Sequence, residues 1–225
     1  MRSDTLALTT ITFPEIHLQP RDAHKLRGYF GELFRAHSPL LHNHYEDGTY
    51  RQQYPLVQYK VLDGTPTLVG LGDGANLLVQ LFLHIRELDI DGRHYAVQAK
   101  HIVHQPAPIG FCAELHRYRF ATRWMPLNQE NHREYQQLDP AGQRAQLTRI
   151  LTNNLVALLK AAGAYAPDLP RLLVHLALGE PVVTQFKNQP MLGFGGEFIA
   201  NVLVPDGLGL GKSVARGFGA VQRVD

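Results

Sequence analysis

One dipeptide, Asp63-Gly64, constrains the fold of this chain more than any other feature of its sequence. It separates two runs of strand-forming residues, YPLVQYKV at 54–61 and TPTLVGLG at 65–72. Aspartate followed by glycine accepts the positive φ angles that a two-residue hairpin turn requires. The pattern therefore predicts two antiparallel strands in the first half of the chain.

The segments around this hairpin indicate a complete structural unit. Residues 5–13 alternate like a strand, and residues 21–37 have the apolar spacing of an amphipathic helix. The apolar face of that helix would comprise Leu26, Tyr29, Phe30, Leu33 and Phe34. Residues 72–88 are typical of a second helix, and residues 94–104 alternate like another strand. The order βαββαβ predicts a ferredoxin-like fold, in which two helices cover one face of a four-stranded antiparallel sheet.

The second half of the chain indicates a modified copy of the same fold. Pro106-Ala107-Pro108 is expected to interrupt the first set of elements, which places a domain boundary near residue 106 and gives two domains, 1–105 and 106–225. A strand is expected at 110–124, and Asp139-Pro140 should begin a long helix that ends at Gly163.

Further strands are expected at 171–178, 181–187 and 191–204, with a short last strand at 218–224. No second helix is expected in this half. The predicted fold class is α+β, with tandem ferredoxin-like (RRM-like) domains of which the second is modified.

The composition limits the compartment and the partners that can be expected for this protein. A single cysteine, Cys112, excludes an internal disulfide framework and a cysteine-rich zinc site, which favours a reducing, cytoplasmic setting. The first residues lack the features of a signal peptide, and no window has the roughly 18 apolar residues of a membrane helix, so no membrane partner is expected. The net charge of +2 does not by itself indicate nucleic-acid binding.

A glycine-rich stretch at 207–219 contains five glycines, one lysine and one arginine. It is not a P-loop, because Asp206 stands where that motif needs its first glycine, and it is not a dinucleotide-binding fingerprint, because Val214 stands where that motif needs its last. Flexible backbone with exposed N–H groups, together with two cations, suits a phosphodiester backbone. The alternative is a mobile surface loop. The candidate RNA-binding residues are Gly207, Gly209, Gly211, Lys212, Ser213, Arg216, Gly217 and Gly219.

The run GLGKSVARGFGAV at 209–221 resembles the signature loop of the RAMP superfamily, in particular of Cas family six, the endoribonucleases that process CRISPR repeats. Residues 49–75 and 122–135 are also similar to that family. The resemblance implies tandem ferredoxin-like domains and cleavage of precursor CRISPR RNA within the repeat. It implies attack by the 2′-hydroxyl before the cut, which leaves a 2′,3′-cyclic phosphate or 3′-phosphate and a 5′-hydroxyl. The sequence has no clear carboxylate cluster of the kind that holds two metal ions in nucleases, so no metal or other cofactor is expected.

The resemblance also implies partners and catalytic residues. The partners would be CRISPR repeat RNA, as precursor and as mature crRNA, and it leaves open other Cas effector subunits. Family members carry catalytic histidine in or just after the first helix, which here singles out His42 and His44, with Tyr50 or Tyr45 donating to the phosphate. Histidine suits both the base and the acid that this reaction needs.

Several alternatives remain open. The stretch His42-Asn43-His44 could be an ordinary polar loop, and two histidines could ligate zinc, although no further ligands are evident nearby. The helping lysine of some family members could correspond to Lys25 or to Lys60. A non-catalytic RAMP-type RNA-binding subunit of a Cas complex is the main rival function. A small-molecule enzyme on a ferredoxin-like scaffold is a third, because that fold supports many activities.

Overall fold

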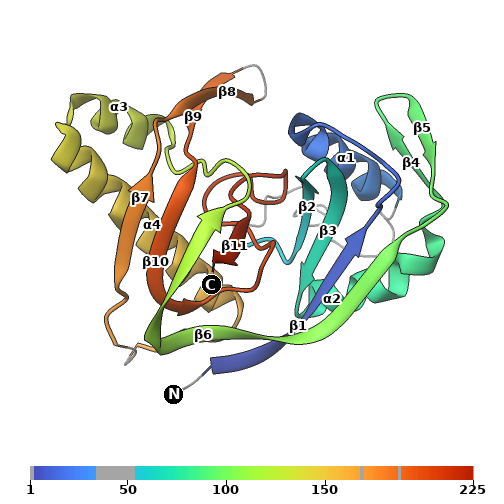
Figure 1. Ribbon diagram of the computed structural model, residues 1–225, viewed down its shortest axis with the longest axis horizontal. Coiled ribbons are helices and arrows are strands. Elements are labelled where there is room, and N and C mark those ends of the chain that lie inside the picture. The colour runs from blue at the N-terminus through green and yellow to red at the C-terminus, as the bar shows by residue number, and fades with distance from the viewer. Residues whose placement is uncertain (1–2, 34–53, 168–169, 187–188, 225) are drawn as a thin grey trace, which may run out of the picture. The chain divides into compact units, whose positions relative to one another are not determined.

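The computed structural model describes residues 3–33, 54–167, 170–186 and 189–224, and they form two compact units (Figure 1). The N-terminal unit comprises Thr5–Ala107 together with Val214–Gly217. The C-terminal unit consists mainly of Pro108–Ser213 and 218–224. Among the described residues, no helix is long and apolar enough to span a membrane.

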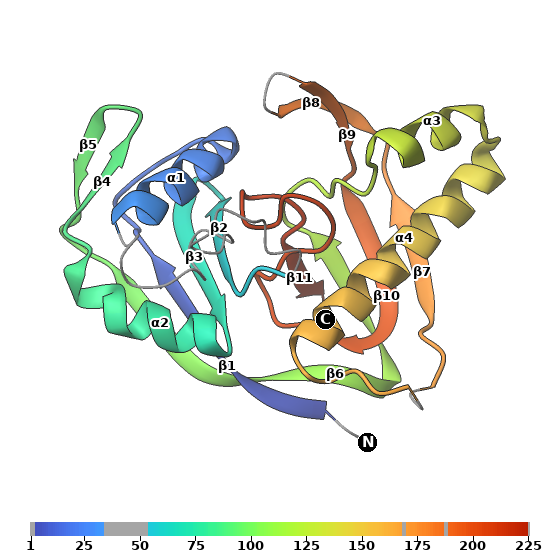
Figure 2. The ribbon, with the colours of Figure 1, turned by 180° about the vertical axis from the view of Figure 1, so that it is seen from behind.

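The N-terminal unit is a ferredoxin-like fold. Its sheet has the strand order β6-β1-β3-β2, which is the 4-1-3-2 order of that fold, and α1 and α2 lie on the same side of β1, β2 and β3 (Figures 1 and 2). The elements of this unit are β1 (Ser3–Thr12), η1 (Pro20–Asp22), α1 (Ala23–Leu33), β2 (Val57–Leu62), β3 (Thr65–Leu71), α2 (Asp73–Leu81), η3 (Phe82–His84), β4 (Glu87–Ile90), β5 (Arg93–Ala96) and the start of β6 (His101–Phe120).

The hairpin that the sequence predicts is confirmed. Asp63 and Gly64 have φ angles of 48° and 80°, and Leu62 pairs with Thr65 across the turn. Behind the sheet, the ring of Phe30 on α1 lies 5.7 Å from that of Tyr59 on β2, and both side chains are fully buried. Leu33 differs from the prediction, because 42% of it is exposed at the end of α1.

A second hairpin was missed between α2 and β6. The expected helix at 72–88 ends at Leu81 instead, and β4 pairs with β5 around Asp91-Gly92. Both turn residues have positive φ, 62° and 76°, and the Asp89 carboxylate accepts the N–H of Gly92 at 2.9 Å. The same Asp-Gly signal that predicts the first hairpin was therefore present here too.

The C-terminal unit repeats the 4-1-3-2 order as β11-β6-β10-β7, which confirms the tandem ferredoxin-like fold. Its helix α4 crosses β7 and β10 (Figure 2). Its elements are the remainder of β6, α3 (Gln129–Gln137), α4 (Pro140–Ala161), β7 (Val174–Leu178), β8 (Val182–Phe186), β9 (Gln189–Gly193), β10 (Gly196–Leu203) and β11 (Val221–Val224).

Two expectations for this half were wrong. Pro106 and Pro108 do not interrupt the chain, because β6 continues through both; the fixed φ of proline is compatible with extended backbone and costs only an N–H donor. The single strand expected at 191–204 is split into β9 and β10, and Gly196, the first residue of β10, adopts a φ of 121°. The long helix is confirmed, with the Asp139 carboxylate accepting the N–H of Gly142 at its start.

Aromatic side chains form much of the core of the C-terminal unit. The rings of Tyr118 and Phe198, on neighbouring strands, are 5.1 Å apart, and the ring of Phe120 is 5.3 Å from those of Phe198 and Trp124. The indole N–H of Trp124 donates to the side-chain oxygen of Asn154 on α4. Trp124 therefore links the sheet to the helix, and it also lies against the glycine-rich segment at 207–219.

Candidate nucleic-acid interface

The glycine-rich segment stands in the chain where a ferredoxin-like fold has its second helix, between β10 and β11. It is packed rather than mobile. Leu208 and Leu210 are fully buried, and Val214 is nearly so. A compact loop with buried apolar side chains thus takes the place of the missing helix. This packing contradicts the alternative of a mobile surface loop.

The expectation of a flexible backbone with exposed N–H groups is wrong for much of this segment. Gly207 donates its N–H to the carbonyl of Val221 at 2.8 Å, and Leu210 donates to the carbonyl of Gly219 at 2.9 Å. The N–H of Gly219 donates in turn to the carbonyl of Arg123, and Gly209 forms an antiparallel bridge with Ala220. These donors are occupied by the protein's own carbonyls and so are not available to a phosphate.

The glycines allow close packing of the loop on itself. Gly219 has a φ of 65°, and a Cβ added there would lie 2.0 Å from the carbonyl oxygen of Leu210. At Gly211, with a φ of 92°, an added Cβ would lie 2.7 Å from the indole nitrogen of Trp124. Both positions therefore require glycine for a reason internal to the C-terminal unit.

Lys212 and Ser213 line a pocket of about 690 Å³ in the C-terminal unit, whose lining mixes polar and apolar side chains. The Lys212 backbone is fixed by an N–H donated to the carbonyl of Met125 at 3.0 Å, while its side chain is exposed. Ser213 adopts a φ of 56°, which is uncommon for a residue with a side chain. The other described lining residues are Leu127, Asn128, Gln129, Glu130, His132, Pro190, Met191 and Leu192.

The start of α3 gives this pocket a second positive feature. The Asn128 side chain caps the helix by accepting the N–H of Asn131 at 2.7 Å, and the N–H groups of Gln129 and Glu130 have no partner within the helix. A helix N-terminus carries partial positive charge, which adds to that of Lys212. Helix α3 was not predicted from the sequence, although an asparagine before a run of polar helix-forming residues is a helix-start signal.

The remaining loop residues belong to the N-terminal unit. Arg216 forms a parallel bridge with Tyr59 at the outer edge of β2. Gly217 has a φ of 101°, and a Cβ added there would lie 2.5 Å from the Cβ of Ala23 at the start of α1. The candidate RNA-binding residues are thus divided, with 207–213 and Gly219 in one unit and Arg216 with Gly217 in the other.

The two candidate helping lysines lie in different environments. Lys60 is fully buried on β2, donates to the carbonyl of Val214 at 2.7 Å, and has its pKa lowered by burial to about 7. Lys25 lies 3.0 Å from the Asp22 carboxylate and 3.1 Å from that of Asp91. Its hydrogen bond to Asp22 is the largest cause raising its pKa. Lys25 is therefore held as a charged ion pair, whereas Lys60 is held where charge is unfavourable.

The candidate catalytic residues His42, His44 and Tyr50, and the alternative Tyr45, lie outside the described residues. Their assignment stays a prediction. Within the part of the chain that the structure describes, no three His, Cys, Asp or Glu side chains lie close enough to hold a metal ion.

Family comparison covers nearly the whole chain. Residues 4–107 match the model of the Cas6b N-terminal domain, and residues 110–224 match that of the Cas6b C-terminal domain. This chain belongs to the Cas6b family. A crystal structure of Cas6b superposes on this Cas6b chain with a TM-score of 0.92 and 33% sequence identity, covering 98% of this chain and all of the other.

Two further relatives are similar to this chain. A crystal structure of the CRISPR RNA processing endoribonuclease Cas6b has a TM-score of 0.79 and 30% identity, and covers 98% of this chain and all of the other. An uncharacterized protein of Methanocaldococcus jannaschii is 32% identical over 146 residues, which are 65% of this Cas6b chain and 98% of the relative.

Proposed function

We propose that this Cas6b chain is a metal-independent endoribonuclease that cuts precursor CRISPR RNA within the repeat. The observation that carries the proposal is the match, along almost the whole chain, to the CRISPR RNA processing endoribonuclease Cas6b. In this proposal the first domain, 1–105, carries the catalytic histidines and the second, 106–225, carries most of the RNA-binding loop. Precursor and mature crRNA are its partners.

The cleavage step needs two proton transfers. One of His42 and His44 removes the proton of the 2′-hydroxyl, whose oxygen attacks the adjacent phosphorus. The P–O5′ bond breaks, and the other histidine, in its protonated form, gives its proton to the leaving 5′-oxygen. Tyr50 donates a hydrogen bond to the phosphate as negative charge builds up on it. The products are a 2′,3′-cyclic phosphate and a 5′-hydroxyl, so no metal-bound water is required.

Binding of the RNA backbone is assigned to side chains more than to glycine N–H groups. Lys212 is exposed in the same pocket as the start of α3, whose first N–H groups have no partner within the helix, and both features attract a phosphate. The Ser213 hydroxyl in the same pocket can donate a further hydrogen bond. Because the backbone donors of Gly207 and Gly219 are occupied, these glycines contribute by shaping the loop.

The test is cleavage of a synthetic repeat RNA by the purified protein in EDTA. We expect cutting at one position, with a 5′-hydroxyl on the downstream product, and no cutting of the same RNA with a single 2′-deoxy substitution before that position. Activity that needs magnesium, or cutting of the deoxy substrate, would contradict the proposed chemistry. Tight binding without any cutting would instead support the non-catalytic RNA-binding subunit.

A further inference from the structure

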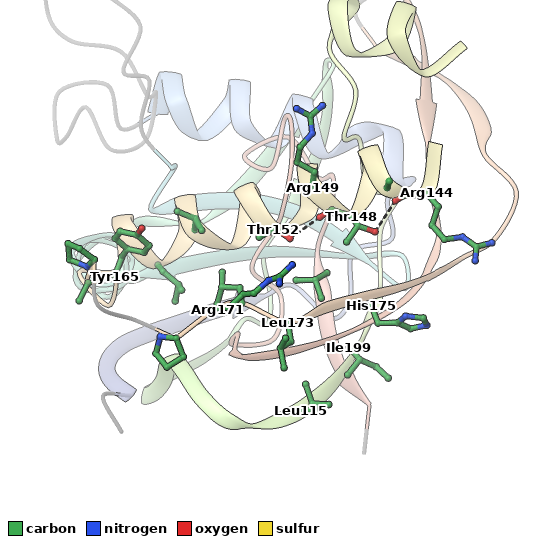
Figure 3. Close-up of a pocket in the computed structure, with 18 of the residues that line it drawn as sticks. Leu115, Arg144, Thr148, Arg149, Thr152, Tyr165, Arg171, Leu173, His175 and Ile199 are labelled. Atoms are coloured by element: carbon green, nitrogen blue, oxygen red, sulfur yellow. Dashed lines mark hydrogen bonds between the residues drawn. The ribbon is translucent and has the colours of Figure 1, made fainter. Parts of the chain in front are cut away.

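A long groove runs along α4 in the C-terminal unit and is not used by the proposed reaction (Figure 3). It encloses about 1140 Å³. Its α4 wall extends from Pro140 to Leu159, a distance of about 28 Å at 1.5 Å per residue. The opposite wall is formed by residues around Arg171, Leu173 and His175, with Leu115 and Ile199 below them (Figure 3). The groove is therefore elongated, as a bound helix or extended segment requires.

The groove has a mainly apolar lining. Leu115 and Leu173 expose 58% and 52% of their surface there, although large apolar side chains usually find cover. The hydroxyl groups of Thr148 and Thr152 donate to the carbonyls one turn earlier in α4, at 2.8 and 2.9 Å. Each hydroxyl is thus already bonded, and the α4 wall gains little hydrogen-bonding capacity from either threonine.

Positive charge surrounds this apolar strip. Arg144, Arg149 and Arg171 all contribute to the lining, and Figure 3 shows Arg144 and Arg149 on α4 with Arg171 across the groove. Arg149 lies 3.7 Å from the Glu134 carboxylate on α3, which satisfies it in part. None of the described lining residues is acidic. A ligand that fits the groove should therefore combine an apolar face with carboxylates at its margins.

The lining favours a protein segment over nucleic acid. Proteins that bind unpaired bases use aromatic platforms, but here most of the wall is aliphatic. The Tyr165 ring is already covered by the Lys160 ammonium group, 5.0 Å from the ring centre. An amphipathic helix laid in a groove, with apolar anchors and charged edges, matches both the shape and the chemistry. We propose that this groove binds an acidic amphipathic helix of a partner protein.

The proposal can be tested with three synthetic helical peptides of 18 residues. The first has a leucine stripe flanked by glutamates, the second has the same stripe flanked by lysines, and the third has glutamates but alanines in place of leucines. We expect the first to bind the full-length protein, measured by fluorescence anisotropy, and the other two to bind at least about tenfold more weakly. Equal binding of all three, or binding of none, would overturn the proposal.

Variants locate the binding site. Arg144→Glu with Arg171→Glu should weaken the first peptide about tenfold or more, since two ion pairs become two repulsions. Leu173→Gln should weaken it without changing charge. The matched control is Arg93→Glu with Arg133→Glu, which changes the net charge equally at exposed positions outside the groove. An equal effect of both double variants would contradict a specific site.

Two further measurements exclude other occupants. If the Arg144 and Arg171 double variant loses repeat RNA binding well beyond the loss in the control, the groove binds RNA and the proposal fails. If it abolishes a concentration-dependent dimer seen by sedimentation and the control does not, the occupant is a second copy of this chain. Repeat cleavage should be unaffected by Leu173→Gln, which separates this inference from the proposed function.

Discussion

Replacing the buried Lys60 by methionine should make the protein more stable at neutral pH. Burial lowers the pKa of Lys60 from 10.5 to about 7, so the unfolded chain holds a proton here that the folded chain gives up. Each pKa unit is worth about 1.36 kcal/mol, so below pH 7 the lowered pKa of Lys60 reduces the free energy of unfolding by about 5 kcal/mol. The substitution removes this cost but leaves the Val214 carbonyl without its donor, a loss of about 1–3 kcal/mol.

The pH dependence isolates the charge from the lost hydrogen bond. Between the folded and unfolded pKa values the unfolded state binds more protons, so the stability of the wild-type protein rises with pH. From pH 7.5 to 9.5 this single group should add about 2.5 kcal/mol to the free energy of unfolding. Other titrating groups are common to both proteins. The stability advantage of Lys60→Met should therefore shrink by about 2.5 kcal/mol over this range.

Urea unfolding followed by far-ultraviolet circular dichroism measures the difference, provided that the transitions are two-state. Fluorescence of the single tryptophan, Trp124, which belongs to the other unit, should give the same midpoint if the transition is two-state. The control is Lys25→Met. The pKa of Lys25 is raised in the folded state, so the stability from its pairing is complete below pH 10.5 and is lost only as pH rises through the folded pKa. Its effect should be constant from pH 7.5 to 9.5.

A constant difference between Lys60→Met and the wild type across these pH values would refute the reasoning. It would mean that Lys60 keeps its proton in the folded protein and that the charge is balanced by its surroundings. If Lys60→Met is less stable than the wild type at pH 7.5 but the difference changes with pH as expected, the pKa argument stands. In that case the lost hydrogen bond to Val214 costs more than the burial of the charge.

Three other variants test the proposed reaction and the loop. His42→Ala combined with His44→Ala should slow repeat cleavage by roughly 10²- to 10⁴-fold in single-turnover assays while RNA affinity is kept, and unchanged cutting would remove both from the mechanism. Lys212→Ala combined with Arg216→Ala should flatten the log–log salt dependence of RNA binding by roughly 1.4 units, and an unchanged slope would place the phosphate contacts elsewhere. Gly219→Val should lower the free energy of unfolding by about 2–4 kcal/mol, through its positive φ and its clash with a loop carbonyl, and wild-type thermal stability would contradict the packing described here.

Short-range signals in the sequence determined most of the elements. Asp63-Gly64 fixed the central hairpin because its preference for positive φ is a property of two adjacent residues. Asp139 and Gly163 marked the ends of the long helix for equally local reasons, a side-chain cap and a residue at a φ of 69°. The order of these elements was enough to predict tandem ferredoxin-like domains.

The candidate site was predicted only in part. The sequence singled out Lys212 and Ser213, but not the start of α3 beside them, because their common pocket joins residues more than 80 positions apart. The glycines were correctly singled out as unusual, yet at Gly211 and Gly219 the cause is contact with Trp124 and with the carbonyl of Leu210. The sequence pattern alone could not distinguish a glycine that lets a ligand approach the backbone from a glycine that lets another part of the protein approach it.

Tertiary structure alone decided the state of the two lysines. Lys25 and Lys60 are hard to tell apart in the sequence, since each is a lysine followed directly by an apolar residue inside a predicted element. In the fold, Lys60 donates to a carbonyl 154 positions away and is closed off from water, whereas Lys25 pairs with two carboxylates. Periodicity tells which side of an element is apolar, but the pKa of a group depends on the atoms that surround it, and distant parts of the chain supply those atoms.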